Sequence, residues 1–117
     1  MQEVRAPSEL MNLSRNLFSE VVKQLEKDFA MSGISIDLSD ATDPNEMWLT
    51  ILSTLNELLK EDVEILRNLL YRVDLKESNV NELVLGLETQ DFVIEIGKQI
   101  VAREIQKVLT RLKYKLD

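Results

Sequence analysis

Histidine and cysteine are both absent from this chain of 117 residues. Without a thiol the chain cannot form a disulfide, a zinc–thiolate site or a thiol nucleophile. Without an imidazole it lacks the commonest general base, the commonest transition-metal ligand and the usual activator of a nucleophilic serine. The two absences argue against a hydrolase or a metalloenzyme. We therefore expect no catalysis, no cofactor and no metal site.

Glycine, proline and aromatic residues are scarce. The three glycines, at positions 33, 86 and 97, cannot form a glycine-rich phosphate loop, and no small-molecule substrate is indicated. Because aromatic residues make up 5% of the chain, leucine, isoleucine and valine must form the core. A hydrophobic content of 44% is enough for one core at this length. We expect a single domain over residues 1–117, with residues 1–7 as a flexible arm.

Long apolar runs are missing as well. No stretch approaches the ~20 apolar residues that span a bilayer, and the first residues lack the pattern of a secretory signal. The net charge is −7, which disfavours binding to nucleic acid or to an anionic membrane. These features predict a soluble, cytoplasmic protein without membrane contact.

Hydrophobic residues recur at spacings of three and four from Leu10 to Phe29. This period predicts an amphipathic helix. Ser8 can cap its start, and Gly33 suits the left-handed position that follows a helix end.

A second helical pattern begins at Asp43 and Pro44, which resemble an N-cap followed by a first-turn proline. The pattern continues to about residue 75. One unbroken helix of some 32 residues would be about 48 Å long, too long for a compact domain of this size. We therefore expect a break at residues 60–62, with Asp62 capping a further helix. The alternative of one continuous helix over residues 44–75 stays open.

Between the first two predicted helices the hydrophobic period changes from 3.6 residues to 2 residues, because Ile34, Ile36 and Leu38 alternate with polar residues. We interpret residues 34–42 as an extended segment that lies across the bundle. A strand that pairs with a second copy of the chain is the alternative. The expected fold is an all-α, single-domain bundle of four to five helices with this one extended segment.

The last and longest helix is predicted over residues 89–116, after a short helix at residues 81–86. Its apolar residues cover roughly 200° of the helix surface, wider than the ~100° stripe of a helix that faces a single core. It should therefore have neighbours on two flanks, either two helices of this chain or one helix and a second copy. Gly97 lies inside the apolar arc. A close approach by another helix would explain it, and a tolerated glycine without such a contact is the equal alternative.

Positive charge gathers on the same helix. Residues 98–117 contain six basic and two acidic residues, although the whole chain is acidic. Arg103, Lys107 and Arg111 are four residues apart and form a basic ridge that could line phosphates. Glu104 within the ridge weakens that interpretation, and the helix dipole explains basic residues near a helix C-terminus without a ligand.

Tyr71, Arg72 and Asp74 form the only tight group of reactive residue types. We expect the ring of Tyr71 in the core with its hydroxyl at the edge, and the other two side chains in solvent.

Two segments, LLYRVDL at residues 69–75 and REIQKVLTRLKY at residues 103–114, resemble stretches of small, acidic, all-helical bacterial proteins of uncharacterised function. The two segments cover under a fifth of the chain. The resemblance implies a helical fold and a bacterial cytoplasmic setting, and it implies no activity.

The function expected from these observations is a protein–protein interaction or structural module. Its partner would be another protein or a second copy, with a homodimer formed through the C-terminal helix as one form. The alternative is nucleic-acid binding through the basic ridge. The candidate interaction surface consists of Gly97, Ile100, Arg103, Glu104, Lys107, Val108, Arg111 and Tyr114.

Overall fold

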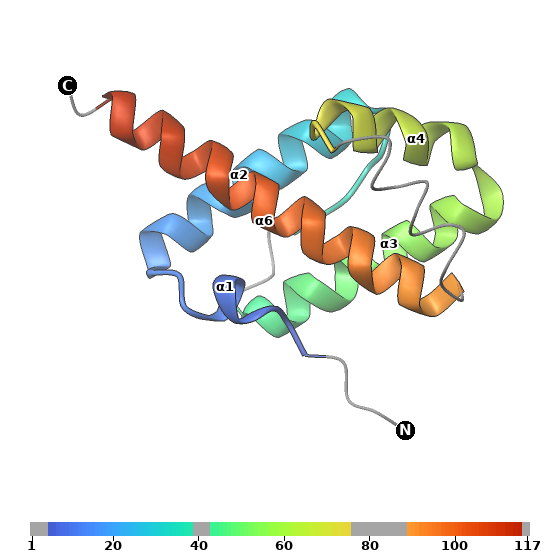
Figure 1. The fold of residues 1–117 in the computed structure, drawn as a ribbon, viewed down its shortest axis with the longest axis horizontal. Coiled ribbons are helices and arrows are strands. Elements are labelled where there is room, and N and C mark those ends of the chain that lie inside the picture. The colour runs from blue at the N-terminus through green and yellow to red at the C-terminus, as the bar shows by residue number, and fades with distance from the viewer. Residues whose placement is uncertain (1–4, 39–42, 76–88, 116–117) are drawn as a thin grey trace.

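The computed structural model describes residues 5–38, 43–75 and 89–115. These residues contain helices and no strand, which confirms the all-α fold (Figure 1). None of these helices is both long and apolar enough to cross a membrane. The short helix expected at residues 81–86 lies outside the described residues. The described helices are α1 (Ser8–Met11), α2 (Arg15–Met31), α3 (Pro44–Glu61), α4 (Val63–Arg72) and α6 (Thr89–Lys115).

Helix α6 is the central element of the bundle. Its 27 residues give it a length of about 40 Å at 1.5 Å per residue, close to the 43 Å longest dimension of the molecule. It packs against α1, α2 and α3, and Figure 1 shows it crossing the other helices. The predicted neighbours on two flanks are confirmed, and both flanks are covered by helices of the same chain.

Side-chain caps mark where α3 and α4 begin. The carboxylate of Asp43 accepts a hydrogen bond from the backbone N–H of Asn45 at 3.0 Å, with Pro44 in the first turn. Asp62 separates the two helices and accepts from the N–H of Ile65 at 3.3 Å. The predicted break and both caps are confirmed.

The single helix expected between Ser8 and Gly33 is wrong at its start. The structure has two helices there, because α1 ends at Met11 and the hydroxyl of Ser14 caps α2 by accepting from the N–H of Leu17 at 3.2 Å. The hydroxyl of Ser14 allowed a new start within one hydrophobic pattern. The expected cap by Ser8 is also wrong, because the N-cap of α1 is Pro7 and no side chain caps this helix. At the other end the prediction is confirmed, since Gly33 has a φ of +87°.

The flexible arm expected at residues 1–7 is also wrong for its described part, residues 5–7. Ala6 is buried, and its N–H donates to the side-chain oxygen of Asn45 at 3.0 Å. This hydrogen bond attaches the start of the chain to the first turn of α3.

Residues 34–38 are extended, as predicted, and no strand pairing occurs within the described residues. Ile34 and Leu38 are buried, so the alternation points hydrophobic side chains into the bundle. The N–H of Leu38 donates to the carboxylate of Glu26 at 3.3 Å, which holds the segment against α2. Residues 39–42 lie outside the described residues.

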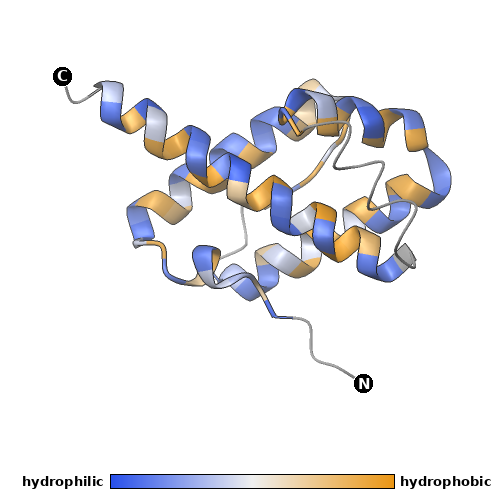
Figure 2. Cartoon of the chain, in the orientation of Figure 1, coloured by the Kyte–Doolittle hydropathy of each residue, from blue (hydrophilic) through white to orange (hydrophobic). Residues whose placement is uncertain are grey.

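Hydrophobic residues recur along every described helix, and those that face the neighbouring helices form the core (Figure 2). Its largest fully buried side chain is Trp48 of α3. The ring of Trp48 lies against Gly97, where an added Cβ would be 2.9 Å from Cη2 of the ring and 3.2 Å from Cδ2 of Leu52. Of the two explanations for Gly97, the close approach by another helix is confirmed, and the neighbour is α3.

We predict that Gly97→Ala destabilises the protein. Alanine favours a helix over glycine by about 1 kcal/mol, but the added methyl group meets a fully buried ring that cannot move without disturbing the core. Overpacking of this kind costs ~1–3 kcal/mol. Because the 2.9 Å contact places the overpacking cost above the helix gain, urea unfolding should show a net loss of up to about 2 kcal/mol. Ser53→Ala, at an exposed position of α3, is the control and should change stability by less than about 0.5 kcal/mol. A Gly97→Ala variant as stable as the wild type would contradict the packing argument.

Candidate functional site

The three cations of the basic ridge form ion pairs with other parts of the same chain. Two of their partners lie on α2, and the third follows α4. Arg111 also donates to the side-chain oxygen of Gln24 at 2.8 Å. The ridge therefore faces the chain itself. The pairs are Arg111 with Glu20 at 3.0 Å, Lys107 with Asp28 at 3.1 Å, and Arg103 with Asp74 at 3.2 Å.

Two carboxyl groups are buried at the middle ion pair of the ridge, that of Lys107 with Asp28. Asp28 of α2 is 4% exposed and Glu104 of α6 is fully buried. Lys107 lies at the edge of this buried carboxyl pair, where its ammonium group donates both to Asp28 and, at 3.3 Å, to the backbone carbonyl of Arg72. One side chain of α6 thus contacts α2 and the end of α4.

The two carboxyl groups have opposite pKa shifts. Burial, and after it the hydrogen bond and negative charge of Asp28, raises the pKa of Glu104 to about 9. Burial alone would also raise the pKa of Asp28, but hydrogen bonds with Glu104, Gln24 and Lys107 and the charge of Lys107 outweigh it and hold this pKa below its ordinary value. At neutral pH the pair therefore holds one proton, on Glu104, and one negative charge, on Asp28.

The contact between the two carboxyl groups is loose. Within the described residues neither oxygen of Glu104 has a partner in good hydrogen-bond geometry. The hydrogen bond to Asp28 is therefore poorly formed and contributes less than burial to the raised pKa of Glu104. The pKa of Glu104 is raised mainly because its side chain is buried. The side chain has no exposed surface, which agrees with this cause. A neutral carboxyl group costs far less to bury than a charged one.

A shared proton between two carboxyl groups is the basis of several acid–base catalysts, but a substrate has no route to this pair. The depression described below is lined by other residues. No group of three or more acidic residues in the described part of the chain could hold a metal ion. The geometry of the buried carboxyl pair therefore supports a structural role at the α2–α6 interface.

Sequence reasoning placed Glu104 on the basic ridge and missed its burial. The signal was present in the spacing, because Glu104 follows Ile100 by four residues and precedes Val108 by four, and both are buried. Asp28 follows the buried Leu25 by three residues in the same way. Each carboxyl group thus lies inside an apolar arc.

We predict that Glu104→Gln removes a pH dependence of stability. In the folded protein Glu104 keeps its proton up to about pH 9, whereas in the unfolded chain it loses the proton near its ordinary pKa of 4.5. The free energy of unfolding of the wild type should therefore fall as pH rises between these values, by at most ~1.4 kcal/mol per pH unit. Glutamine is neutral in both states and has no such slope. Urea unfolding at several pH values in this window measures it.

Glu95→Gln is the matched control for that experiment, because Glu95 lies on the same helix and pairs with Lys98 in partly exposed surroundings. It should keep the wild-type slope. Equal slopes for wild type and Glu104→Gln would contradict a protonated Glu104.

We predict that Lys107→Met destabilises the protein by about 2–3 kcal/mol, somewhat below the cost of breaking a fully buried ion pair. The substitution leaves the charge of Asp28 buried with Gln24 as its remaining donor. The loss should shrink when Asp28→Asn is already present, and chemical unfolding of the double-mutant cycle tests this. Lys98→Met, at the exposed pair on the same helix, should cost under about 0.5 kcal/mol. A loss that is the same with and without Asp28→Asn would show that the ion pair is not its cause.

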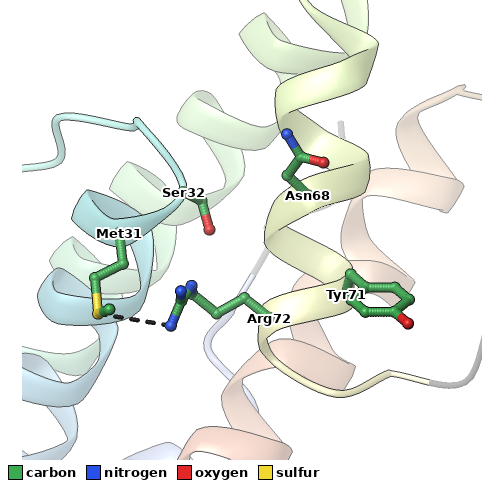
Figure 3. Close-up of a pocket in the computed structure, with 5 residues that line it drawn as sticks. All are labelled: Met31, Ser32, Asn68, Tyr71 and Arg72. Carbon is green, nitrogen blue, oxygen red and sulfur yellow. Dashed lines mark hydrogen bonds between the residues drawn. The ribbon is translucent and has the colours of Figure 1, made fainter.

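A separate feature lies on the surface, where the C-terminal ends of α2 and α4 meet. The two helix ends border an open depression of about 370 Å³. Figure 3 shows the guanidinium group of Arg72 reaching across it, with Nη1 at 3.5 Å from the sulfur of Met31. Tyr71 projects from the same turn of α4 on the side away from Met31. We call this region the α2–α4 surface; its residues are Met31, Ser32, Asn68, Tyr71 and Arg72.

The expected position of Tyr71 is wrong, because its side chain is 83% exposed. The core face of α4 consists of Leu66, Leu69, Leu70 and Val73, which are all buried. The residue after Leu70 turns by about 100° away from this face. Met31 at the end of α2 is 55% exposed.

The candidate interaction surface predicted on the last helix needs a larger correction. Gly97, Ile100, Glu104 and Val108 are buried against other helices of the chain and cannot reach a partner in this fold. The physical reason is that α1, α2 and α3 together cover the wide apolar arc. The remaining predicted residues are Arg103 and Lys107, which are partly buried and ion-paired, Arg111, which is exposed and ion-paired, and Tyr114, which is 72% exposed.

Comparisons with protein-family models, with curated proteins and with solved structures each found no match to this chain. The resemblance of residues 69–75 and 103–114 to bacterial helical proteins therefore stays a prediction.

Proposed function

We propose that this protein is a small protein-binding module that acts through the α2–α4 surface and catalyses no reaction. The observation that carries the proposal is the 83% exposure of Tyr71 beside the exposed Met31 and Arg72 at one depression. Tyrosine, methionine and arginine are enriched at protein interfaces relative to the rest of the surface. Isolated exposed hydrophobic residues are ordinary, but Met31 and Tyr71 border one hollow beside Arg72 and are not scattered. We place this module in the cytoplasm, as the composition suggests.

The ion pairs of α6 favour this proposal over nucleic-acid binding. Each cation of the basic ridge already has a carboxylate within 3.2 Å, so a phosphate would have to compete with these carboxylates. The charges of the ridge are thus neutralised by contacts within the fold, whereas the exposed residues of the α2–α4 surface are not explained by such contacts.

We predict that Tyr71→Ser removes the binding of a protein partner without unfolding the protein, because the side chain is exposed and contributes little to the core. Affinity capture from native cells, followed by quantitative mass spectrometry, should show partners that the wild type retains and Tyr71→Ser loses. Tyr114→Ser is the matched control, since Tyr114 is also a largely exposed tyrosine but lies on a different helix, near the C-terminal end of α6. A captured set that is identical for all three proteins would count against the α2–α4 surface.

Self-association through the end of α6 is a second candidate, supported by exposed side chains in its last turns. Leu109 is 47% exposed and Tyr114 is 72% exposed. If these residues join two copies, sedimentation at micromolar concentration should show a dimer that Leu109→Ser with Tyr114→Ser converts to a monomer. A wild-type protein that sediments as a monomer at every concentration would remove this candidate.

A further inference from the structure

The α2–α4 surface carries a cation, Arg72, whose charge no carboxylate of the described residues neutralises. Arg72 forms no ion pair among the described residues, and its guanidinium group contacts the sulfur of Met31 at 3.5 Å. A thioether sulfur is only a weak hydrogen-bond acceptor. Arg67, one turn earlier on the same helix, already has a carboxylate partner in Glu64 at 3.5 Å. Arg72 therefore keeps a planar cation available at the depression.

A second cation adds to the local field. Lys27 precedes Met31 by one turn of α2 and lies on the same side of that helix. It is exposed and has no ion pair within the described residues. Met31 is thus flanked by Lys27 and Arg72 on a protein whose net charge is −7. A positive spot on an acidic protein attracts negative groups selectively, because the surrounding surface repels them.

The backbone beneath Arg72 is fixed before any partner arrives. Lys107 donates to the carbonyl oxygen of Arg72 at 3.3 Å and to the carboxylate of Asp28 at 3.1 Å. The end of α4 is therefore attached to both α2 and α6. Binding at a preorganised site costs less conformational entropy than binding at a mobile one.

We propose that the α2–α4 surface binds an acidic peptide segment, in which an Asp or Glu carboxylate pairs with Arg72 while neighbouring apolar or aromatic side chains pack against Met31 on one side of Arg72 and against Tyr71 on the other. This inference rests on the proposed function and adds the chemistry of the partner. A carboxylate accepts two parallel hydrogen bonds from a guanidinium group and is a far better acceptor than sulfur. The 370 Å³ depression has room for side chains of the partner.

Selection from a random peptide library tests this partner chemistry directly. The full chain is the bait, as wild type, Arg72→Gln, Tyr71→Ser and, as matched control, Arg67→Gln. We expect the wild type and Arg67→Gln to enrich peptides with an acidic residue next to an apolar or aromatic one. A synthetic peptide from this set should bind Arg72→Gln about tenfold more weakly than the wild type, the size expected for a hydrogen bond to a charged group. Replacing the acidic residue of the peptide by its amide should cost the wild type the same factor and cost Arg72→Gln little.

Two results would overturn the inference, and they differ in what they leave standing. Peptides that depend on Tyr71 but carry no preferred acidic residue would overturn the acidic-partner inference while the proposed binding function stands. A library in which no peptide depends on Tyr71 or Arg72 would remove both. Circular dichroism of every variant should match the wild type, since all three substituted side chains are exposed.

Discussion

The ion pair between Lys107 and Asp28, closed off by a neutral Glu104, is the contact on which the arrangement of this bundle depends. It joins the longest helix to α2 and, through the carbonyl of Arg72, to the end of α4. Because a buried charge is tolerated only with a partner, this contact admits few relative positions of the three helices. Together with the close contact of Gly97 with Trp48, it constrains the register of α6.

The features that sequence predicted well are local ones. Asp43, Asp62 and Gly33 act on backbone groups within three residues of themselves, so their roles follow from neighbouring residues alone. The wide apolar arc of α6 was also readable, because periodicity is a property of one helix. The second start at Ser14 was not anticipated, since two capping residues compete within one hydrophobic pattern and packing decides which of them acts.

The features that sequence did not predict depend on which helices meet. Whether Glu104 faces water or α2 cannot be decided from its neighbours in sequence, although its spacing from buried residues is a usable warning. The same holds for Tyr71, whose exposure follows from how the short α4 docks. As a consequence, half of the interaction surface expected on α6 is buried, and the surface proposed in its place lies at the ends of α2 and α4.

The contact between Gly97 and Trp48 also gives the protein an internal optical reporter. Trp48 is the single tryptophan of the chain, it is fully buried, and its indole N–H has no acceptor in the described part of the structure. An indole ring in such dry, apolar surroundings emits at shorter wavelength than one in water. Its fluorescence therefore reports separation of α3 from α6. Opening of the core can thus be followed without attaching any label.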